Sequence, residues 1–438
     1  MTANRRPRLL FLAYAFPPLS APATPRARYI AKYLARSGWD ITVVTPHPSY
    51  WRRTDHPEEV DPFLKREGIH RIATGLRWQC LDSEYVRYWD RRIGWLIGGI
   101  CRRIAKWLSI ESQIGWVSEI ESSCQGISLS DIDIIMATGN PWISFRAASL
   151  LGQRIGVPFV LDYRDLWNTN PHLLKPLPRR IAKEEETLIN SCAAVTAVSP
   201  SLADSLRRRF QEIKNLFVVT NGFDPDDLSN IQPYNFGHFA IVYAGNFYTP
   251  KRVITPLMKA MQQIDSTDNG GSPEWRFHYY GKDQKHVALE AEKHGVIERT
   301  VFHGHVPRQE VLSAVAGAGV NVVITSVLEE GSLEDRGIIT SKVFEALGLG
   351  SKILLIAPAG SDVILIVEGS NCGQCFSGSQ TDEIASYLRK LMTGGQPKPK
   401  PPTQYAWPEI IRPLDSQLRK ILHEHTSVRS NPSISSSG

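Results

Sequence analysis

The stretch GIITSKVFEALGLGSK, residues 337–352, contains the residues whose types and spacing are most informative about chemistry. Thr340 or Ser341 can cap a helix, and the glycines near the end of the stretch stop it before a short apolar strand. Lys342 and Glu345 then share one face within the first turns of this helix. A lysine beside the positive dipole end of a helix, at the carboxyl end of a strand, is suited to bind phosphate.

Glu345 lies one turn further into the helix than the positions whose side chains cap its N-terminus. A carboxylate beside a phosphate site can accept hydrogen bonds from both hydroxyls of a ribose. An ordinary ion pair between Lys342 and Glu345 on a helix surface explains the same spacing and contributes little stability. The spacing alone leaves both interpretations open.

A second basic loop follows another strand, in the stretch YAGNFYTPKR. Gly245 ends the strand, and Lys251 and Arg252 lie in the loop behind it. The two cations suit a second phosphate contact, although a basic surface turn has the same composition.

Polar and aromatic residues also gather after a strand in the stretch VLDYRDLWN. Asp162, Arg164, Asp165 and Trp167 follow one another where open parallel sheets place their sites. Carboxylates and an indole suit the hydroxyls and the ring face of a sugar. A structural Arg–Asp pair beneath the site is the alternative.

Several other kinds of site lack their motifs. Neither GxGxxG after a strand nor GxxxxGK[ST] occurs, and HExxH and GxSxG are missing too. Cys372 and Cys375 have CxxC spacing, but no second pair stands where a four-ligand zinc site needs one. We therefore expect no metal. The six cysteines are too sparse for a disulfide scaffold and fit a reducing compartment.

Strands and helices alternate along the chain, and these elements must position the candidate residues. With 438 residues, 42% of them hydrophobic and 21% charged, the chain fits two folded domains of about 200 residues each. Strand, helix and strand at the start imply a parallel sheet, and a second series of strands begins at FAIVYAGN. Strands are expected at LLFLA, ITVVT, DIDIIMAT, VPFVLDYRD, AAVTAVS, FAIVYAGN, WRFHYYG, TVFHG, VNVVIT and KILLIA.

The segment RRIGWLIGGICRRIAKWL, residues 91–108, is the most apolar helical candidate. Its isoleucines recur along one side, and its basic residues lie mostly elsewhere, as in a helix that lies at a membrane surface. An amphipathic helix packed on its own domain is the alternative. No stretch approaches the roughly 20 apolar residues that span a bilayer. The net charge of +6 suits an anionic ligand or membrane surface, but also an ordinary solvated surface.

Five motifs together resemble those of a known family. They are LDYRDLW, TAVSPSL, VTNGFD, YAGNF with Gly245, and SKVFEAL with Lys342 and Glu345. In combination they resemble the large retaining family of GT-B glycosyltransferases, of family 4-like type, that contains many lipopolysaccharide and exopolysaccharide enzymes. The resemblance covers most of residues 8–425.

This resemblance implies an α/β fold of the GT-B type, with two Rossmann-like domains facing each other across a cleft. Residues 1–225 would form the acceptor-side domain and residues 226–404 the domain that binds the nucleotide sugar. The C-terminal helix, residues 408–422, would pack back on the first domain. Residues 426–438 have almost no apolar content and are expected to form a disordered tail.

The resemblance also assigns roles to individual residues. Lys251, Arg252 and Lys342 would be the catalytic cations that stabilise the departing diphosphate, and Glu345 would bind the ribose. The remaining donor-binding residues would be Gly245, Asn246, Gly337, Ile338, Ile339, Thr340 and Ser341. The acceptor side would include Arg28, Asn140, Arg164, Asp165 and Trp167.

Two positions depart from the family pattern. Many members have a glutamate eight residues before the one matched by Glu345, where this chain has Gly337. The basic residue that often follows the glycine matched by Gly245 is Asn246 here. Recognition of the sugar and of the diphosphate is therefore arranged differently from the common pattern.

We hypothesise a cytoplasmic, retaining hexosyltransferase-type enzyme of cell-surface polysaccharide biosynthesis. It would move a sugar from a nucleoside-diphosphate sugar to a glycan or lipid-linked acceptor, without a cofactor, a metal or a nucleic-acid partner. Contact of residues 91–108 with the inner face of the plasma membrane is a further expectation. A nucleotide-sugar epimerase and a non-catalytic nucleotide-sugar-binding subunit are the alternatives.

Overall fold

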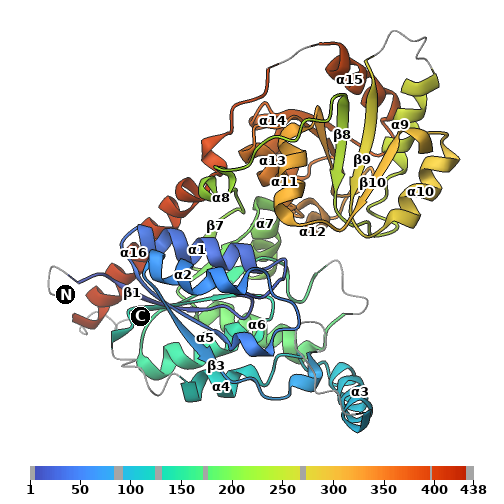
Figure 1. The fold of residues 1–438 in the computed structure, drawn as a ribbon. Coiled ribbons are helices and arrows are strands. Elements are labelled where there is room, and N and C mark those ends of the chain that lie inside the picture. Colours follow the sequence, from blue (N-terminus) through green and yellow to red (C-terminus); the bar gives the residue numbers. More distant parts are fainter. Residues whose placement is uncertain are drawn as a thin grey trace. The chain divides into compact units, whose positions relative to one another are not determined.

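The computed structural model describes residues 5–82, 92–123, 131–170, 176–266, 273–394 and 397–430. Contacts divide the chain into two units, each containing one parallel sheet (Figure 1). The N-terminal unit comprises residues 1–198, 202–219 and 410–438, and the C-terminal unit comprises residues 199–201 and 220–409.

The N-terminal unit contains a seven-stranded parallel sheet in the order β3-β2-β1-β4-β5-β6-β7. The strand order reverses between β1 and β4, which creates the switch point where open α/β sheets bind ligands. Its strands are β1 (Arg8–Leu12), β2 (Asp40–Pro46), β3 (Ile69–Thr74), β4 (Ile134–Thr138), β5 (Phe159–Tyr163), β6 (Ala194–Ala197) and β7 (Leu216–Val218). Its helices are α1 (Thr24–Arg36), α2 (Pro57–Glu67), α3 (Arg92–Trp107), α4 (Trp116–Ser123), α5 (Ile143–Ile155), α6 (Arg179–Ser191) and α7 (Pro200–Arg209), with short 3-10 turns η1 (Pro48–Tyr50) and η2 (Gln79–Leu81).

The C-terminal unit contains a six-stranded parallel sheet in the order β10-β9-β8-β11-β12-β13. Its strands are β8 (Phe239–Ala244), β9 (Trp275–Tyr280), β10 (Thr300–Gly304), β11 (Val320–Ile324), β12 (Ile353–Ile356) and β13 (Gly373–Phe376). Its helices are α8 (Pro225–Leu228), α9 (Thr255–Ser266), α10 (Gln284–Lys293), α11 (Arg308–Gly317), α12 (Leu333–Arg336), α13 (Ser341–Gly348), α14 (Asp362–Gly369) and α15 (Thr381–Thr393), with η5 (Ile297–Arg299) and η6 (Thr403–Tyr405).

Helices cover both faces of the second sheet. Apolar side chains of α9, α10 and α15 pack on one face, and those of α11, α13 and α14 pack on the other (Figure 1). Central strands covered on both sides consist of consecutive apolar residues, such as the fully buried ILLI of β12. The strands expected from such runs are observed in both units, and the parallel α/β fold is confirmed.

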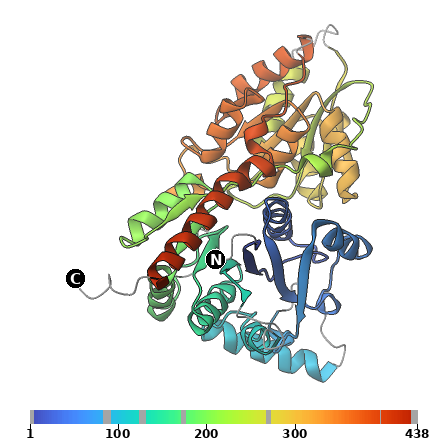
Figure 2. The same ribbon diagram turned by 90° about the vertical axis from the view of Figure 1, so that its left-hand side faces the viewer.

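The last helix, α16 (Trp407–Ser430), is one long element (Figure 2). From Ile410 onward it belongs to the N-terminal unit, where Asp415 accepts a hydrogen bond from the indole of Trp39 at 2.5 Å. The disordered tail was expected to begin at residue 426, but α16 continues to Ser430. Within its last turns Thr426 Oγ1 donates a hydrogen bond to Leu422 O, one turn earlier in the helix, at 2.7 Å. Residues 431–438 lie outside the described part of the chain.

None of the helices in the described ranges has the length and apolar character needed to cross a bilayer.

Candidate functional site

Helix α13 places Lys342 and Glu345 at the carboxyl edge of the second sheet. Val343, Ala346 and Leu347 are buried and anchor the helix on the core. Thr340 occupies the N-cap position with an extended backbone, but no side-chain hydroxyl caps the helix, so the expected capping bond is not observed. The helix is held by its apolar face instead.

Lys342 extends from α13 to the end of β8, directly in front of Gly245. A Cβ atom at position 245 would collide with Lys342 Nζ, and Gly245 has φ +154, which disfavours other residues. Lys342 forms no ion pair or hydrogen bond with any residue in the described ranges; its ammonium lies 6.0 Å from the ring centroid of Tyr243. Burial, followed by the charge of Arg252, lowers the pKa of Lys342 to about 8. The position therefore offers a desolvated cation that forms no ion pair with any residue the structure describes.

Glu345 points to a different cation. Its Oε1 atom accepts two hydrogen bonds from Arg308, from Nη2 at 2.8 Å and from Nε at 3.1 Å. Arg308 is the first residue of α11 and also approaches Asp227 at 3.9 Å. The interpretation of Lys342 and Glu345 as a surface ion pair is therefore wrong, because Arg308 takes the carboxylate.

The basic loop after β8 lies near the same edge. Lys251 Nζ donates to Asp335 Oδ1 at 2.7 Å, and against the opposing effect of burial this ion pair lowers the pKa of Asp335. Arg252 packs on the ring of Tyr248, with 5.3 Å from its guanidinium carbon to the ring centroid. Val327 N donates to the carbonyl of Lys251 at 2.7 Å, which ties the loop to the segment after β11. Both basic side chains are thus held in place.

The remaining donor-side residues lie around this group. Residues 337–340 form the connection between α12 and α13, with Gly337 buried at its start, and Ser341 is the first residue of α13. Asn246 is exposed, and its carbonyl accepts a hydrogen bond from the hydroxyl of Tyr243 at 3.4 Å. Gly245 is fixed by the hydroxyl of Tyr279, which donates to its carbonyl at 3.0 Å.

A cavity of about 1250 Å³ lies in the N-terminal unit, at the carboxyl ends of β1, β4 and β5. Four of the expected acceptor-side residues line it, namely Asn140, Arg164, Asp165 and Trp167. Arg28 does not, because its guanidinium packs on Phe63, 4.9 Å from the ring centroid. The cavity is larger than the roughly 300–1,000 Å³ typical of small-molecule sites, so it has room for more than one sugar ring.

The wall of the cavity is built from aromatic and charged side chains. Trp142 and Trp167 stack with ring centroids 5.3 Å apart and an interplanar angle of 9°. Arg164 donates to the carbonyls of Gly139 at 2.6 Å and Asn140 at 2.8 Å, which fixes the loop after β4. Both indoles are largely buried and belong to the core of the unit, and Arg164 has a positioning role.

Asp162 lies beneath this wall and is fully buried. Its carboxylate accepts hydrogen bonds from Arg26 at 2.6 and 3.0 Å, from Thr196 at 2.7 Å and from Thr138 at 2.8 Å. Burial alone would raise the pKa of Asp162, but Arg26 and the two hydroxyls hold it below its ordinary value. The alternative of a structural Arg–Asp pair therefore applies to Asp162, with Arg26 from α1 as its partner.

Glu111 was not anticipated from the sequence, yet it lines the cavity. It accepts a hydrogen bond from the backbone N–H of Trp142 at the start of α5. Burial raises the pKa of Glu111 to about 7, against the opposing effects of that bond and of Arg146. Nothing in the stretch SIESQIG marks this residue, because its partner lies about thirty residues further along the chain.

Arg308 and Asp335 were also missed as partners of the predicted donor-side residues. Both are charged residues on other elements, and only the packing of α11 and α12 brings them to Glu345 and Lys251. Within the described residues, one group of side chains could hold a metal ion, namely the exposed His56, Glu58 and Glu59 at the start of α2. It belongs neither to the cavity nor to the Lys342 group.

Residues 23–222 match the family model described as the glycosyl transferase 4-like domain. Solved structures that align along almost the whole chain include the following three. Sucrose-phosphate synthase from Thermosynechococcus elongatus is 15% identical, with 97% of this chain and 99% of that chain covered and a TM-score of 0.56. Anabaena HepE in complex with UDP and glucose is 14% identical, with 97% and 100% covered and a TM-score of 0.55.

The third structure is the lipopolysaccharide outer core galactosyltransferase WaaB, 12% identical, with 95% and 99% covered and a TM-score of 0.55. No curated protein sequence matches the chain significantly. The structural similarities show that the chain has the GT-B fold, two parallel-sheet α/β domains.

Proposed function

We propose that this protein is a retaining glycosyltransferase that moves a hexose from a nucleoside-diphosphate sugar to a glycan or lipid-linked acceptor. The observation that carries the proposal is Lys342, a desolvated lysine without an ion-pair partner among the described residues, facing Gly245 at the end of β8. A diphosphate supplies the missing negative charge. The match of residues 23–222 to the glycosyl transferase 4-like domain supports the same activity.

The chemistry follows from the cations around the diphosphate position. The bond between the anomeric carbon and the diphosphate oxygen breaks, and its electron pair leaves with the nucleoside diphosphate. Lys342 and Arg252 stabilise that developing charge, and Lys251 joins them when the diphosphate displaces Asp335. The acceptor hydroxyl attacks the same face of the sugar, and its proton passes to the departing diphosphate, so that configuration is retained.

The ribose position belongs to Glu345 in this proposal. Both hydrogen bonds from Arg308 end on Oε1, so the other carboxylate oxygen, Oε2, can accept from a ribose hydroxyl. The structure of HepE in complex with UDP and glucose supports a nucleoside diphosphate as the ligand of this fold. The backbone of residues 337–341 would approach the sugar, with Gly337 in place of a side-chain contact.

The proposed setting is cell-surface polysaccharide biosynthesis at the cytoplasmic face of the plasma membrane. WaaB, an outer core galactosyltransferase of lipopolysaccharide, has the same fold and supports that setting. Residues 91–108 would provide the membrane contact, and the cavity beside Trp167 would take the acceptor. No metal or cofactor takes part in the scheme.

Calorimetric titration with UDP, GDP and ADP tests the donor site. One nucleotide should bind selectively, and Lys342→Ala and Glu345→Ala should each weaken its binding at least about tenfold. Lys285→Ala, which removes an exposed lysine of α10, is the control and should bind as wild type. Unchanged binding by both site variants would overturn the assignment.

A transfer assay separates the catalytic alternatives. The radiolabelled nucleotide sugar that fits the preferred base is incubated with the protein, with and without a pool of lipid-linked and free glycans. Transfer only in the presence of acceptor supports the glycosyltransferase. Conversion of the donor sugar without an acceptor indicates an epimerase, and binding without any turnover indicates a binding subunit.

A further inference from the structure

The hydroxyl of Tyr279 connects two loops at the carboxyl edge of the second sheet. Tyr279 is a residue of β9, and its fully buried ring belongs to the apolar core. Its hydroxyl donates to the carbonyl of Gly245, after β8, at 3.0 Å and accepts from Asp283 N, after β9, at 2.9 Å. Burial raises the pKa of Tyr279 to about 12, so the hydroxyl keeps its proton at neutral pH. A phenylalanine would fill the same core position, and the hydroxyl therefore serves the loops.

Asp283 forms the second connection between these loops. It occupies the N-cap position of α10, where an aspartate commonly accepts a hydrogen bond from its own helix. The side chain of Asp283 makes no such cap, and its Oδ2 instead accepts from the backbone N–H of Phe247 at 2.7 Å. The ring of Phe247 stacks on Tyr243, with ring centroids 4.8 Å apart. The loop after β8 is therefore held at Gly245 by Tyr279 and at Phe247 by Asp283.

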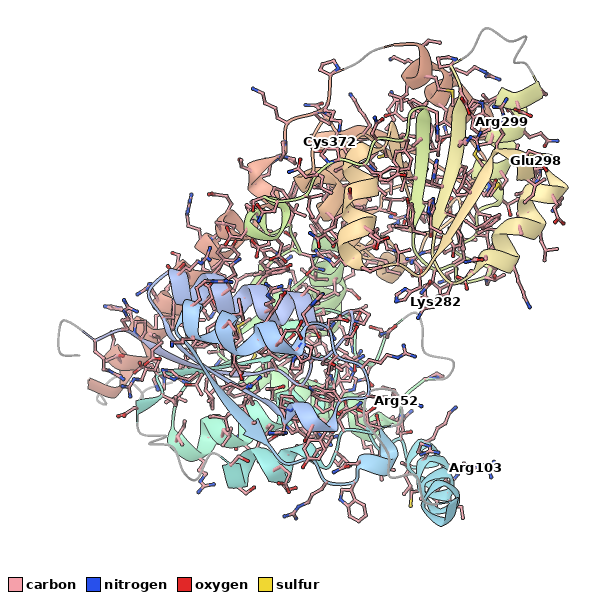
Figure 3. The ribbon with its side chains drawn as sticks, in the orientation of Figure 1. Arg52, Arg103, Lys282, Glu298, Arg299 and Cys372 are labelled. Atoms are coloured by element: carbon pink, nitrogen blue, oxygen red, sulfur yellow. The ribbon has the colours of Figure 1, made fainter. Side chains whose placement is uncertain are left out.

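A glycine allows the two loops to approach each other. A Cβ atom at position 281 would collide with the carbonyl oxygen of Gly245 and with the hydroxyl of Tyr279. The next residue, Lys282, is exposed at the carboxyl edge of the sheet, where Figure 3 labels it. The loop after β9 thus brings its backbone against Gly245 and leaves its charged side chain in solvent.

The bond from Tyr279 also orients the peptide unit between Gly245 and Asn246. This peptide is trans, so its carbonyl and its N–H point in opposite directions. Because the carbonyl points to the buried hydroxyl of Tyr279, the N–H of Asn246 points away from the core. Asn246 is exposed, and its N–H has no acceptor among the residues that the structure describes. The ammonium of Lys342 lies beside the same glycine, and an N–H with a lysine next to it suits an anion.

We propose that Tyr279 and Asp283 are positioning residues for the diphosphate of the nucleotide sugar. They hold the loop after β8 so that the N–H of Asn246 donates to the β-phosphate beside Lys342. A donor that is already oriented binds an anion without the entropic cost of ordering its loop. Tyr279 and Asp283 act through the backbone of the loop and do not touch the ligand. The inference rests on the proposed glycosyltransferase function and assigns the residues that support its donor site.

Calorimetric titration of Tyr279→Phe tests the first connection. Affinity for the preferred nucleoside diphosphate should fall about three- to tenfold, the effect of one lost hydrogen bond. Affinity for the monophosphate of the same base should change less than about twofold, because this ligand has no β-phosphate. Tyr387→Phe is the control, since it removes another buried hydroxyl of the same unit, which donates to Ile353 O at 3.4 Å, and it should bind both nucleotides as wild type. Unchanged diphosphate affinity of Tyr279→Phe, or equal losses for both nucleotides, would overturn the positioning role.

Two substitutions of Asp283 test the second connection. Asp283→Ala removes the acceptor of the Phe247 N–H and should weaken diphosphate binding about three- to tenfold. Asp283→Asn keeps an oxygen acceptor and should retain the affinity of wild type within about twofold. Asp382→Ala, which removes a carboxylate from the first turn of α15, is the control and should bind as wild type. Diphosphate binding by Asp283→Ala as tight as that of wild type would contradict the proposal.

The same titrations separate this inference from the proposed function. If wild-type protein binds no nucleotide, the donor site itself is wrong and the inference fails with it. If wild-type protein binds a nucleotide and Lys342→Ala weakens that binding, while Tyr279→Phe and Asp283→Ala do not, only the positioning role is overturned.

Discussion

Lys251 and Asp335 form an ion pair in the C-terminal unit, with 2.7 Å between Nζ and Oδ1. Ser332 supports the carboxylate, because its hydroxyl lies 3.1 Å from Asp335 Oδ2. One of the three cations proposed to bind the diphosphate is therefore already occupied by a carboxylate. Binding of the diphosphate by Lys251 requires an exchange of partners.

This exchange predicts that Asp335→Asn strengthens nucleotide binding. The amide removes the competing negative charge but keeps an oxygen acceptor. Moving Lys251 from residue 335 to the diphosphate therefore costs less free energy. We expect the affinity for the preferred nucleoside diphosphate to rise about two- to fivefold in calorimetry. Asp382→Asn on α15 is the control for loss of a carboxylate on the same unit. Weaker binding by Asp335→Asn would mean that Asp335 itself contacts the ligand.

The close approach of Gly245 and Lys342 predicts the effect of Gly245→Ala. The new methyl group would collide with Lys342 Nζ and displace the ammonium from its position. Nucleotide affinity should fall at least about tenfold, while the circular dichroism spectrum stays that of a folded protein. Gly369→Ala, where a methyl group meets open space, should bind nucleotide as wild type. Wild-type nucleotide affinity of Gly245→Ala would contradict the role of Lys342 in the donor site.

The lowered pKa of Lys342 predicts a pH dependence of nucleotide binding. The terminal phosphate of a nucleoside diphosphate is ionised above about pH 7, whereas Lys342 loses its proton through a pKa of about 8. Because the diphosphate binds the charged lysine, affinity should decline between about pH 7 and pH 9.5, with proton uptake on binding. Titrations in buffers of different ionisation enthalpy measure that uptake. Lys342→Gln should remove the uptake, and its persistence would point to another group.

The raised pKa of Glu111 predicts how stability responds to pH. The folded protein holds the proton up to a pKa of about 7, whereas the unfolded chain releases it near 4.5. The folded state binds more protons in this window, so the contribution of Glu111 to stability falls as pH rises from about 4.5 to about 7. The melting temperature of Glu111→Gln minus that of wild type should therefore increase across this range. Glu186→Gln on α6 is the control for loss of an exposed carboxylate.

The buried pair of Arg26 and Asp162 predicts a large loss of stability on truncation. Arg26→Met keeps the length of the side chain but leaves the Asp162 carboxylate buried without its cation. The free energy of unfolding in urea should fall by about 3–5 kcal/mol for the transition of the N-terminal unit. Arg207→Met breaks an exposed pair with Asp204 and should cost less than about 1 kcal/mol. Similar losses of unfolding free energy in both variants would contradict a larger stabilising effect of the buried pair.

The sequence by itself determined the class of the fold and most of its strands, while β3 and β13 were not among the expected strands. Consecutive apolar runs such as LLFL and ILLI predict buried parallel strands, because a strand covered by helices on both faces has no polar side. The position of Lys342 and Glu345 at the start of α13 also follows from local signals, since apolar spacing and terminal glycines act within a few residues. These are short-range rules.

Only the tertiary structure decided which charges meet. Lys342 faces Gly245, Glu345 pairs with Arg308, and Asp162 pairs with Arg26 on a helix far away in the sequence. Such partners are set by sheet order and helix packing, and local spacing carries no information about them. The cavity also depends on the tertiary structure, because the end of α3 and the loops after β4 and β5 form it together. Sequence pattern placed candidate residues on elements, and packing determined the partner and the burial of each.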